Sequence, residues 1–326
     1  MRFVQFANGQ GGIEAAVVDD GALYPVGVAM QHLIGEGLNS ALCRGATAIA
    51  EHPPVAQEGP GTGLVPLYPR SFRDFMTFYE HTVGTSGTGV VSAEWYEQPV
   101  FYFSNTSTCI PGDGTVVEYP PGSVQLDFEL EVAAVITGRG RNLTAAGAAR
   151  HVFGYTIVND WSARDTQLRE MRVGLGPAKG KDFATTIGPC IVTADEFEDR
   201  RTSDGRLDAD VRAYVNGQLV CADNLVNMSW RFEELIAQAS RGSVVDSGDI
   251  VGSGTAGNGG CLLELRRSGQ ESPDYLAPGD EVRLEVDGLG SITNIVGSHT
   301  QAPQVGRARP PLRPRRHTTA AVFGTR

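Results

Sequence analysis

The stretch from Asp127 to Ile136 reads DFELEVAAVI, and its first half alternates between acidic and apolar residues. Because side chains of a β-strand point alternately to its two faces, we expect Asp127, Glu129 and Glu131 on one face and an apolar core face opposite. Carboxylates two residues apart on a strand lie about 6 to 7 Å from each other, and they repel unless a cation lies between them. The stretch therefore predicts a strand whose acidic face is either a divalent-cation site or a solvated edge.

Short strands and turns are expected on both sides of this stretch. Asn216-Gly217 separates two apolar runs, a pattern typical of a type I′ hairpin turn, and 41 glycines punctuate the chain. Helices are expected only near 71–81, 144–153, 162–171 and 229–240 in the main part of the chain, and near 28–35 and 40–51 before it. We therefore predict a mixed, β-rich α+β fold.

Three parts of the chain differ in composition. Residues 1–65 are expected to form a small N-terminal β-rich domain that ends in the Gly/Pro-rich segment 58–63. Residues 66–300 are expected to form the main domain. Residues 301–326 combine arginines and prolines without apolar periodicity, so a disordered basic tail is predicted there.

Charge and composition exclude several classes of protein. The chain has 27 Lys and Arg against 38 Asp and Glu, a net charge of −11, which makes nucleic acids and anionic membranes poor partners. No apolar run approaches about 18 residues, so no membrane span is expected. The five cysteines form no Cys-x-x-Cys pair, and the first residues resemble no secretion signal, so a cytoplasmic protein is expected.

A second candidate site lies in residues 71–81, which read SFRDFMTFYEH. If the segment is helical, Asp74 and His81 share a face and lie about 10 Å apart along the axis, so that one end can hold a metal and the other can act as a base. The alternative is structural: Ser71 caps the helix and Asp74 closes a capping box.

A third candidate site follows an apolar strand. Residues 155–167 read YTIVNDWSARDTQ, and Asp160 or Ser162 is expected to cap a helix on which Arg164 and Gln167 share a face. A surface pair of Arg and Gln gives the same pattern.

Two glycine-rich segments, 180–189 and 252–260, suggest backbone close to a ligand, but neither is a phosphate-binding loop or a dinucleotide-binding fingerprint. Glu264 follows in the apolar run Cys261–Leu265, interpreted as a strand. A carboxylate buried there requires a partner such as His81.

Together these motifs resemble the fumarylacetoacetate hydrolase family from Arg70 to Asn294. The matching segments are Glu129-x-Glu131, residues 159–167, Gly180-Lys181-x-Phe183 with Thr185-Thr186, Gly254-Thr255, and Pro278-Gly279-Asp280 leading to residues 288–290 and Asn294. The resemblance implies a fumarylacetoacetase-type β-sandwich roll that is active as a homodimer.

The resemblance also implies roles for individual residues. A divalent metal, usually Mg²⁺ with Ca²⁺ or Mn²⁺ able to substitute, is expected in a site made by Asp74, Glu129, Glu131, Asp160 and Thr185. His81 is expected to be the general base, with Glu264 orienting it and Lys181 beside the metal as a catalytic residue. The residues expected to contact substrate are Arg164, Gln167 and Thr255.

The implied reaction is metal-dependent hydrolysis of a carbon–carbon bond in a 1,3-dicarbonyl acid, an acylpyruvate or a fumarylacetoacetate-like compound, by activated water. An isomerase, decarboxylase or hydratase of 2-oxo acids on the same metal site is the alternative, and a noncatalytic binder is a third. The presence of both His81 and Glu264 favours water activation.

Four positions depart from the family's pattern. Met76, Met171 and Val90 stand where fumarylacetoacetase has substrate-binding tyrosines and an arginine, and Ser104 stands where many short members have a lysine. These residues predict a substrate whose far end is less acidic or more apolar.

Overall fold

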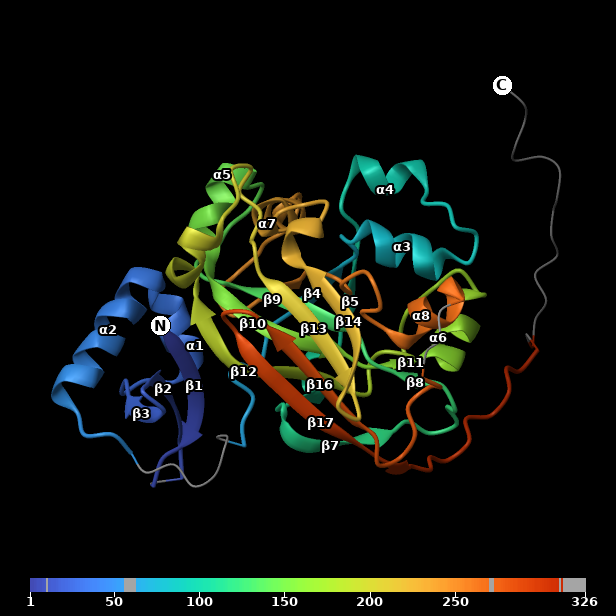
Figure 1. Cartoon of the computed structure of the whole chain (residues 1–326), viewed down its shortest axis with the longest axis horizontal. Helices are drawn as coiled ribbons and strands as arrows, with labels where there is room; N and C mark the ends of the chain where they lie inside the picture. The colour runs from blue at the N-terminus through green and yellow to red at the C-terminus, as the bar shows by residue number, and fades with distance from the viewer. Residues whose placement is uncertain (10, 56–62, 270–272, 311, 313–326) are drawn as a thin grey trace.

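The computed structural model describes residues 1–9, 11–55, 63–269, 273–310 and 312. Two β-sheets form its centre and short helices surround them (Figure 1). This arrangement confirms the predicted mixed, strand-rich class.

Ten strands make the larger sheet. Nine of them follow the hydrogen-bonded order β3 (Ala22–Pro25), β2 (Ile13–Asp19), β1 (Arg2–Ala7), β12 (Thr185–Thr193), β10 (Val152–Asp160), β9 (Leu130–Ile136), β15 (Ile250–Gly252), β4 (Phe72–Phe75) and β5 (Phe101–Ser104). The tenth, β6 (Cys109–Ile110), runs parallel to β12, and β4 runs parallel to β15, whereas the other neighbours are antiparallel. The central strands β9 and β10 are buried along their whole length.

The smaller sheet has five strands, and burial alternates along two of them. Its order is β14 (Gln218–Asn224), β13 (Asp210–Val215), β16 (Glu281–Val286), β17 (Gly290–His299) and β7 (Asp113–Tyr119). Every second residue of β13 and β16 is buried, as expected for a sheet with one face on the core. Asn216 and Gly217 have φ of 51° and 77°, so the predicted type I′ turn is confirmed.

Eight α-helices cover the described sheets. They are α1 (Met30–Glu36), α2 (Leu38–Glu51), α3 (Tyr79–Ser86), α4 (Ala93–Glu97), α5 (Ala145–Ala148), α6 (Arg164–Met171), α7 (Phe232–Ser240) and α8 (Leu262–Ser268). Short 3₁₀ helices span Thr106–Thr108, Ala149–His151, Ala194–Arg200 and Leu225–Asn227, and β8 (Leu126–Asp127) pairs with β11 (Ser162–Ala163). In Figure 1, α1 and α2 lie at one end of the molecule, and α3, α4, α6 and α8 lie at the other.

Two apolar cores hold these layers together. One lies between the two sheets and contains Tyr155 and Trp161. The other joins α1 and α2 to the larger sheet and includes Leu33 and Phe153. Because β1 pairs with β12, the first strands extend the larger sheet.

The predicted boundaries fall mostly on residues that the structure leaves undescribed. In the expected linker, residues 58–62 lie outside the described part, so the division at residue 65 stays a prediction. Of the expected tail, residues 301–310 and 312 are described and contain no helix or strand, and the remaining residues lie outside the described part.

The prediction of a helix over residues 71–81 is wrong. Phe72–Phe75 form strand β4, and helix α3 begins only at Tyr79. The parallel pairing of β4 with β15 buries all four of its residues, which outweighs the local capping signals. Ser71 therefore caps no helix, and Asp74 and His81 come from different elements.

Three further local predictions need correction. Glu264 lies in helix α8, not in a strand. Helix α6 begins at Arg164, and neither Asp160 nor Ser162 caps it. The segment predicted as a helix over 144–153 contains only α5 and a 3₁₀ turn before β10 begins at Val152.

Candidate metal centre and active site

A cavity of about 610 Å³ opens where β4, β5, β9 and helices α3, α6 and α8 meet. Acidic, basic and apolar side chains share its wall. Those relevant to the predicted site are Asp74, His81, Glu129, Glu131, Arg164, Gln167, Lys181 and Thr255. The structure thus brings residues separated by up to 181 positions in the chain to one cavity.

Four carboxylates converge beside this cavity, and three of them line it. Asp74, Glu129, Glu131 and Asp160 each offer an oxygen, and these four oxygens lie within 4.8 Å of one another. All four residues are at most 5% exposed, so the alternative of a solvated strand edge is wrong. The predicted metal-site carboxylates do converge.

Asp127 does not join them, because the acidic alternation breaks before Glu129. Asp127 ends the short strand β8, and its carboxylate accepts hydrogen bonds from the N–H groups of Leu262 and Leu263 at the start of α8. It also pairs with Arg164 Nε at 2.8 Å. Asp127 therefore anchors α8, the helix that carries Glu264.

Two of the four carboxylates have cationic partners. Lys181 Nζ lies 2.6 Å from Asp160 Oδ2 and donates to Glu129, and Arg164 Nη2 lies 2.8 Å from Glu129 Oε1. Burial opposes ionisation of Glu129, but Lys181 and Arg164 together hold its pKa below the usual range. Burial also lowers the pKa of Lys181, yet Asp160 and Glu129 outweigh this effect and raise it above its usual value.

Asp74 and Glu131 form no ion pair with a Lys or Arg in the part of the chain described. Burial, followed by the nearby Asp160 charge, raises the pKa of Asp74 to about 8. Burial and Asp74 likewise raise the pKa of Glu131 well above its ordinary value. A nearby divalent cation would reverse both effects by stabilising the ionised carboxylates.

The donor atoms fit a hard divalent cation. Asp74 Oδ1, Glu131 Oε2, Asp160 Oδ1 and Thr185 Oγ1 are buried and have no hydrogen-bond partner among the described residues. Buried polar atoms are normally paired, and an all-oxygen set suits Mg²⁺, Ca²⁺ or Mn²⁺. Gly252 leaves room for this set, because a Cβ there would come within 2.5 Å of Asp74 Oδ1.

A histidine and a glutamate form a pair beside the carboxylates. His81 Nδ1 lies 3.1 Å from Glu264 Oε2, and Glu264 Oε1 accepts a hydrogen bond from Gly259 N at 3.0 Å. Both side chains are buried, and Gly84 makes room for Glu264, whose Cγ a Cβ at position 84 would approach to 2.6 Å. The predicted pairing of Glu264 with His81 is therefore confirmed, although the prediction that Glu264 lies in a strand was wrong.

The residues predicted to contact substrate also face the cavity. Arg164 Nη1 donates to Gln167 Oε1 at 3.1 Å, and Thr255 Oγ1 donates to Glu131 Oε1 at 3.3 Å. Arg164 is 2% exposed, so a mere surface pair is excluded. Their binding of substrate stays a prediction.

Sequence reasoning missed Tyr102. Its hydroxyl donates to Asp160 Oδ2, and the ring lines the cavity from edge strand β5. Burial and the Asp160 charge raise the pKa of Tyr102 well above its usual value, so the phenol stays protonated. The alternation of Phe101 to Ser104 marked a strand, but nothing in that strand pattern pointed to Asp160.

Apolar residues line the rest of the cavity. Met76, Val90 and Met171, which depart from the family's pattern, all contribute to the wall, together with Trp95 and Leu168. Ser104 is not part of that wall, and its buried hydroxyl has no hydrogen-bond partner among the described residues.

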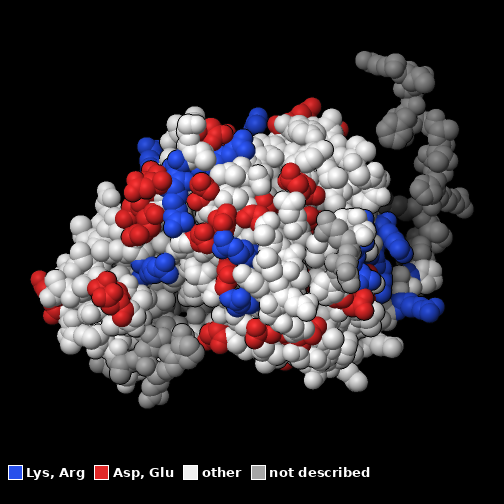
Figure 2. Space-filling view, in the orientation of Figure 1, with Lys and Arg blue, Asp and Glu red and all other residues white. Residues whose placement is uncertain are grey.

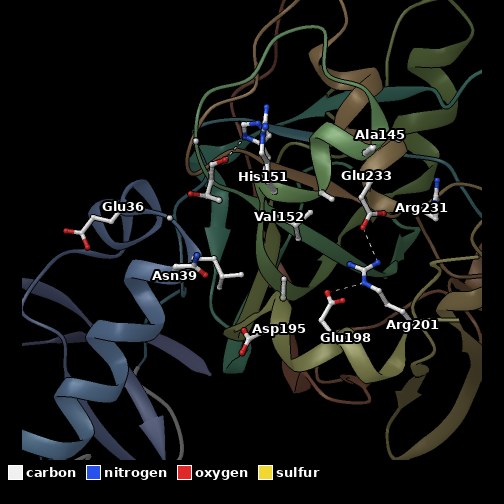
Figure 3. A pocket seen from close by; sticks show the side chains of 18 of the residues that line it. Glu36, Asn39, Ala145, His151, Val152, Asp195, Glu198, Arg201, Arg231 and Glu233 are labelled. Carbon is white, nitrogen blue, oxygen red and sulfur yellow. Dashed lines mark hydrogen bonds and ion pairs between the residues drawn. The ribbon is translucent and has the colours of Figure 1, made fainter. Parts of the chain in front are cut away.

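A second cavity, of about 950 Å³, lies between the α1–α2 junction and the segments around α5, His151 and Glu198 (Figure 3). Its charges compensate each other. Arg201 Nη1 lies 3.0 Å from Glu233 Oε1, and Arg201 Nε lies 3.3 Å from Glu198 Oε1. Figure 3 shows Arg201 between these two carboxylates.

The surface and the helices add two observations. On the face shown in Figure 2, Lys and Arg side chains lie among Asp and Glu side chains. Among the described residues, no helix is both long and apolar enough to cross a membrane.

Curated proteins similar to this chain include a fumarylacetoacetate hydrolase domain-containing protein, oxaloacetate tautomerases and a fumarylacetoacetase. The chain is 35% identical over 198 residues to the fumarylacetoacetate hydrolase domain-containing protein 2 of Pongo abelii, covering 60% of this chain and 58% of the relative. It is 32% identical over 196 residues to an oxaloacetate tautomerase of Bacillus subtilis (strain 168), covering 60% of each, and 34% identical over 202 residues to a mitochondrial oxaloacetate tautomerase of Homo sapiens, covering 61% and 59%. The chain thus spans about three-fifths of the length of these relatives.

Solved structures share the fold. A fumarylacetoacetate hydrolase from Exiguobacterium antarcticum superposes with a TM-score of 0.68 at 24% identity, over 92% of this chain and all of that one. A fumarylpyruvate hydrolase from Pseudomonas aeruginosa, solved with Mn²⁺ and pyruvate, gives a TM-score of 0.57 at 22% identity, over 75% and 99%. The family model described as fumarylacetoacetate (FAA) hydrolase C-terminal matches residues 72–297, which include every residue of the cavity site. This chain therefore belongs to the fumarylacetoacetate hydrolase family.

Proposed function

We propose that the protein is a divalent-metal-dependent hydrolase that cleaves a carbon–carbon bond in an acylpyruvate-like 1,3-dicarbonyl acid. One observation carries the proposal: His81, which Glu264 contacts, lines the same 610 Å³ cavity as three of the four clustered carboxylates, Asp74, Glu129 and Glu131. A general base beside a metal site is the arrangement that water activation requires.

Asp74, Glu129, Glu131 and Asp160 would hold the ion, with Thr185 next to them. We propose Mg²⁺, with Mn²⁺ or Ca²⁺ as substitutes, because all donors are hard oxygens. When bound, a divalent ion polarises carbonyl oxygens and stabilises negative charge that develops on them.

His81 removes the proton from the attacking water. Glu264 accepts a hydrogen bond from the Nδ1–H group of His81, which fixes the tautomer and leaves Nε2 as the basic nitrogen. The hydroxide oxygen forms a bond to the distal carbonyl carbon of the substrate. The carbon–carbon bond then breaks, and its electron pair passes into the enolate of the 2-oxo acid fragment. Protonation of this enolate at carbon gives the second product.

The cationic residues stabilise charge on the organic fragments. Lys181 and Arg164 are buried beside Glu129, where a developing enolate or carboxylate would contact them. Gln167, fixed by Arg164, would hold a further oxygen atom of the substrate. Preorganised donors of this kind supply transition-state stabilisation without reorganisation at the moment of reaction.

Oxaloacetate tautomerisation is the second candidate. The relatives that carry this name are 32–34% identical to the chain. A tautomerase moves one proton between a carbon and an enol oxygen and needs no attacking water. The same base and metal site would serve this reaction.

The test uses chelator-treated protein with and without added Mg²⁺ or Mn²⁺. Acylpyruvates, a fumarylacetoacetate-like diketo acid and oxaloacetate are supplied, enol absorbance is followed, and products are identified by mass spectrometry. Two acid fragments that form only with metal are the expected result. Metal-dependent loss of enol absorbance at unchanged mass would support the tautomerase instead, and metal binding without any turnover would overturn both.

A further inference from the structure

A sulfur atom lies beside the His81–Glu264 pair. Cys261 immediately precedes helix α8, is fully buried, and places Sγ 3.9 Å from His81 Nδ1. The proposed hydrolysis uses no thiol, so the reaction does not explain this contact.

Cys261 belongs to a second group of possible metal ligands. One donor atom each from His81, Cys261 and Glu129 lies within 4.8 Å of the other two. In a tetrahedral zinc site with usual bond lengths, a nitrogen and a sulfur ligand are about 3.6 Å apart. The observed 3.9 Å therefore needs only a shift of a few tenths of an ångström.

We propose that His81, Cys261 and Glu129 form a second metal site, which prefers Zn²⁺ and related soft divalent ions and blocks the general base when occupied. This site stands apart from the proposed reaction, because it requires no substrate. The four-carboxylate site offers only oxygen, whereas this site offers nitrogen, sulfur and oxygen.

Ligand chemistry separates the two sites. Thiolate and imidazole select Zn²⁺, Co²⁺ or Cd²⁺ over Mg²⁺, while carboxylates alone suit Mg²⁺. Burial raises the pKa of the Cys261 thiol well above its ordinary value, so a metal ion must displace the thiol proton, which leaves to solvent. His81 and Glu129 both line the cavity, which gives the ion a path to the buried sulfur.

The two sites share Glu129. An ion on the second site competes for this carboxylate, which Lys181 and Arg164 already contact. It also takes the place of the Nδ1 proton of His81, so the hydrogen bond to Glu264 that orients the base is lost. Soft metals are therefore expected to inhibit the enzyme at concentrations that leave Mg²⁺ in solution unchanged.

The experiment is a Co²⁺ titration of the full-length, Mg²⁺-saturated protein, followed by thiolate-to-cobalt charge-transfer absorbance. The wild type is expected to show this band with one equivalent of Co²⁺, and Zn²⁺ is expected to abolish it. Cys261→Ser should lose the band. Cys190→Ser removes another buried thiol, on β12, and should retain the band.

A Co²⁺ complex of the wild type without a thiolate band would overturn the proposal and place the ion among the four carboxylates. A band that persists in Cys261→Ser would overturn it as well. If Cys261→Ser does not fold, His81→Gln serves instead, with at least a tenfold loss of Co²⁺ affinity expected. Because absorbance needs no turnover, failure of the hydrolase proposal leaves this test valid.

Discussion

The 950 Å³ cavity and the 610 Å³ cavity balance their charged side chains in opposite ways. In the 950 Å³ cavity, Arg201 lies between Glu198 and Glu233, so opposite charges meet within the protein. In the 610 Å³ cavity, Asp74 and Glu131 have no cation partner among the described residues. The smaller cavity is the better candidate for function, because it holds buried carboxylates that only a proton or a bound cation can neutralise.

This imbalance has an energetic consequence. Buried carboxylates without partners destabilise the folded state unless they are protonated or bound to a cation. A ligand present at about 100 times its dissociation constant stabilises a fold by about 2.7 kcal/mol. A bound divalent cation would therefore stabilise the folded protein through the 610 Å³ cavity and not through the 950 Å³ cavity.

The largest expected effect is a loss of turnover on replacing His81 of the 610 Å³ cavity, but not on replacing His151 of the 950 Å³ cavity. His81→Ala should lower the turnover number about 10²- to 10⁴-fold, because it removes the general base, while the affinity of the four carboxylates for Mg²⁺ stays nearly unchanged. The matched control is His151→Ala, which removes a buried histidine that contacts Thr137 O in the larger cavity and should leave turnover intact. Near-normal hydrolysis by His81→Ala would show that the base is assigned wrongly.

The next effect concerns one carboxylate from each cavity. Glu131→Gln should weaken Mg²⁺ or Mn²⁺ binding about 100-fold, as measured by calorimetry. Replacing a residue that only supports a metal ligand costs about 10- to 100-fold in metal affinity, and replacing a ligand itself should cost at least as much. Glu233→Gln should leave metal affinity unchanged. Equal losses in both variants would contradict the difference between the cavities.

Arg201→Met tests the balanced cavity. The variant leaves Glu233 without its cation, so we expect the free energy of unfolding to fall by about 2 kcal/mol, between the values for exposed and buried pairs. Denaturant unfolding measures this change, and Mg²⁺ affinity should be unaffected. A variant as stable as the wild type would mean that the ion pair contributes little.

The pH dependence of the metal-free protein tests the unbalanced cavity. Asp74, with its pKa raised to about 8, keeps its proton in the folded state where the unfolded chain has released it. The free energy of unfolding should therefore fall between about pH 4 and pH 8, by up to about 1.4 kcal/mol per pH unit for this one proton. Metal affinity should rise over the same range. Chemical unfolding at several pH values, with and without Mg²⁺, would reveal a flat profile if Asp74 is ionised throughout.

The smallest effect concerns the apolar wall of the site cavity. The double variant Met76→Tyr, Val90→Arg introduces a hydroxyl and a positive charge, so the ratio of kcat/KM for an acidic over an apolar acyl group should rise a few-fold. Each single variant serves as a control. An unchanged ratio would show that these positions do not contact the far end of the substrate.

Sequence patterns predicted the fold best where one side of a strand faces solvent. In β13 and β16 burial alternates residue by residue, and the turn between β13 and β14 has the predicted form. In β9 both faces are buried: one face packs in the core between the sheets, and the other places Ala133 and Val135 in the second core and Glu131 at the charged site. Alternation alone left a metal site and a solvated edge as equal possibilities there.

The candidate site depended on motifs that lie far apart in sequence. The resemblance to the family brought Asp74, His81 and Glu264 together, although local rules assigned Asp74 to a helix and Glu264 to a strand. Local rules failed because long-range pairing decides these segments: β4 joins β15, and Asp127 fixes the start of α8. Tyr102 escaped notice because its role depends on contact with Asp160, 58 residues away.

The order of strands in the larger sheet determines when the four carboxylates can come together during synthesis of the chain. Strand β4, which carries Asp74, reaches the strand of Glu131 only through β15, residues 250–252. While a ribosome extends the chain, Glu129, Glu131 and Asp160 can assemble with β10 and β12, but Asp74 has no place in the sheet until residue 252 has emerged. A nascent chain shorter than this would therefore lack one of the four carboxylates, so a cation held by all four would bind late in synthesis or after release.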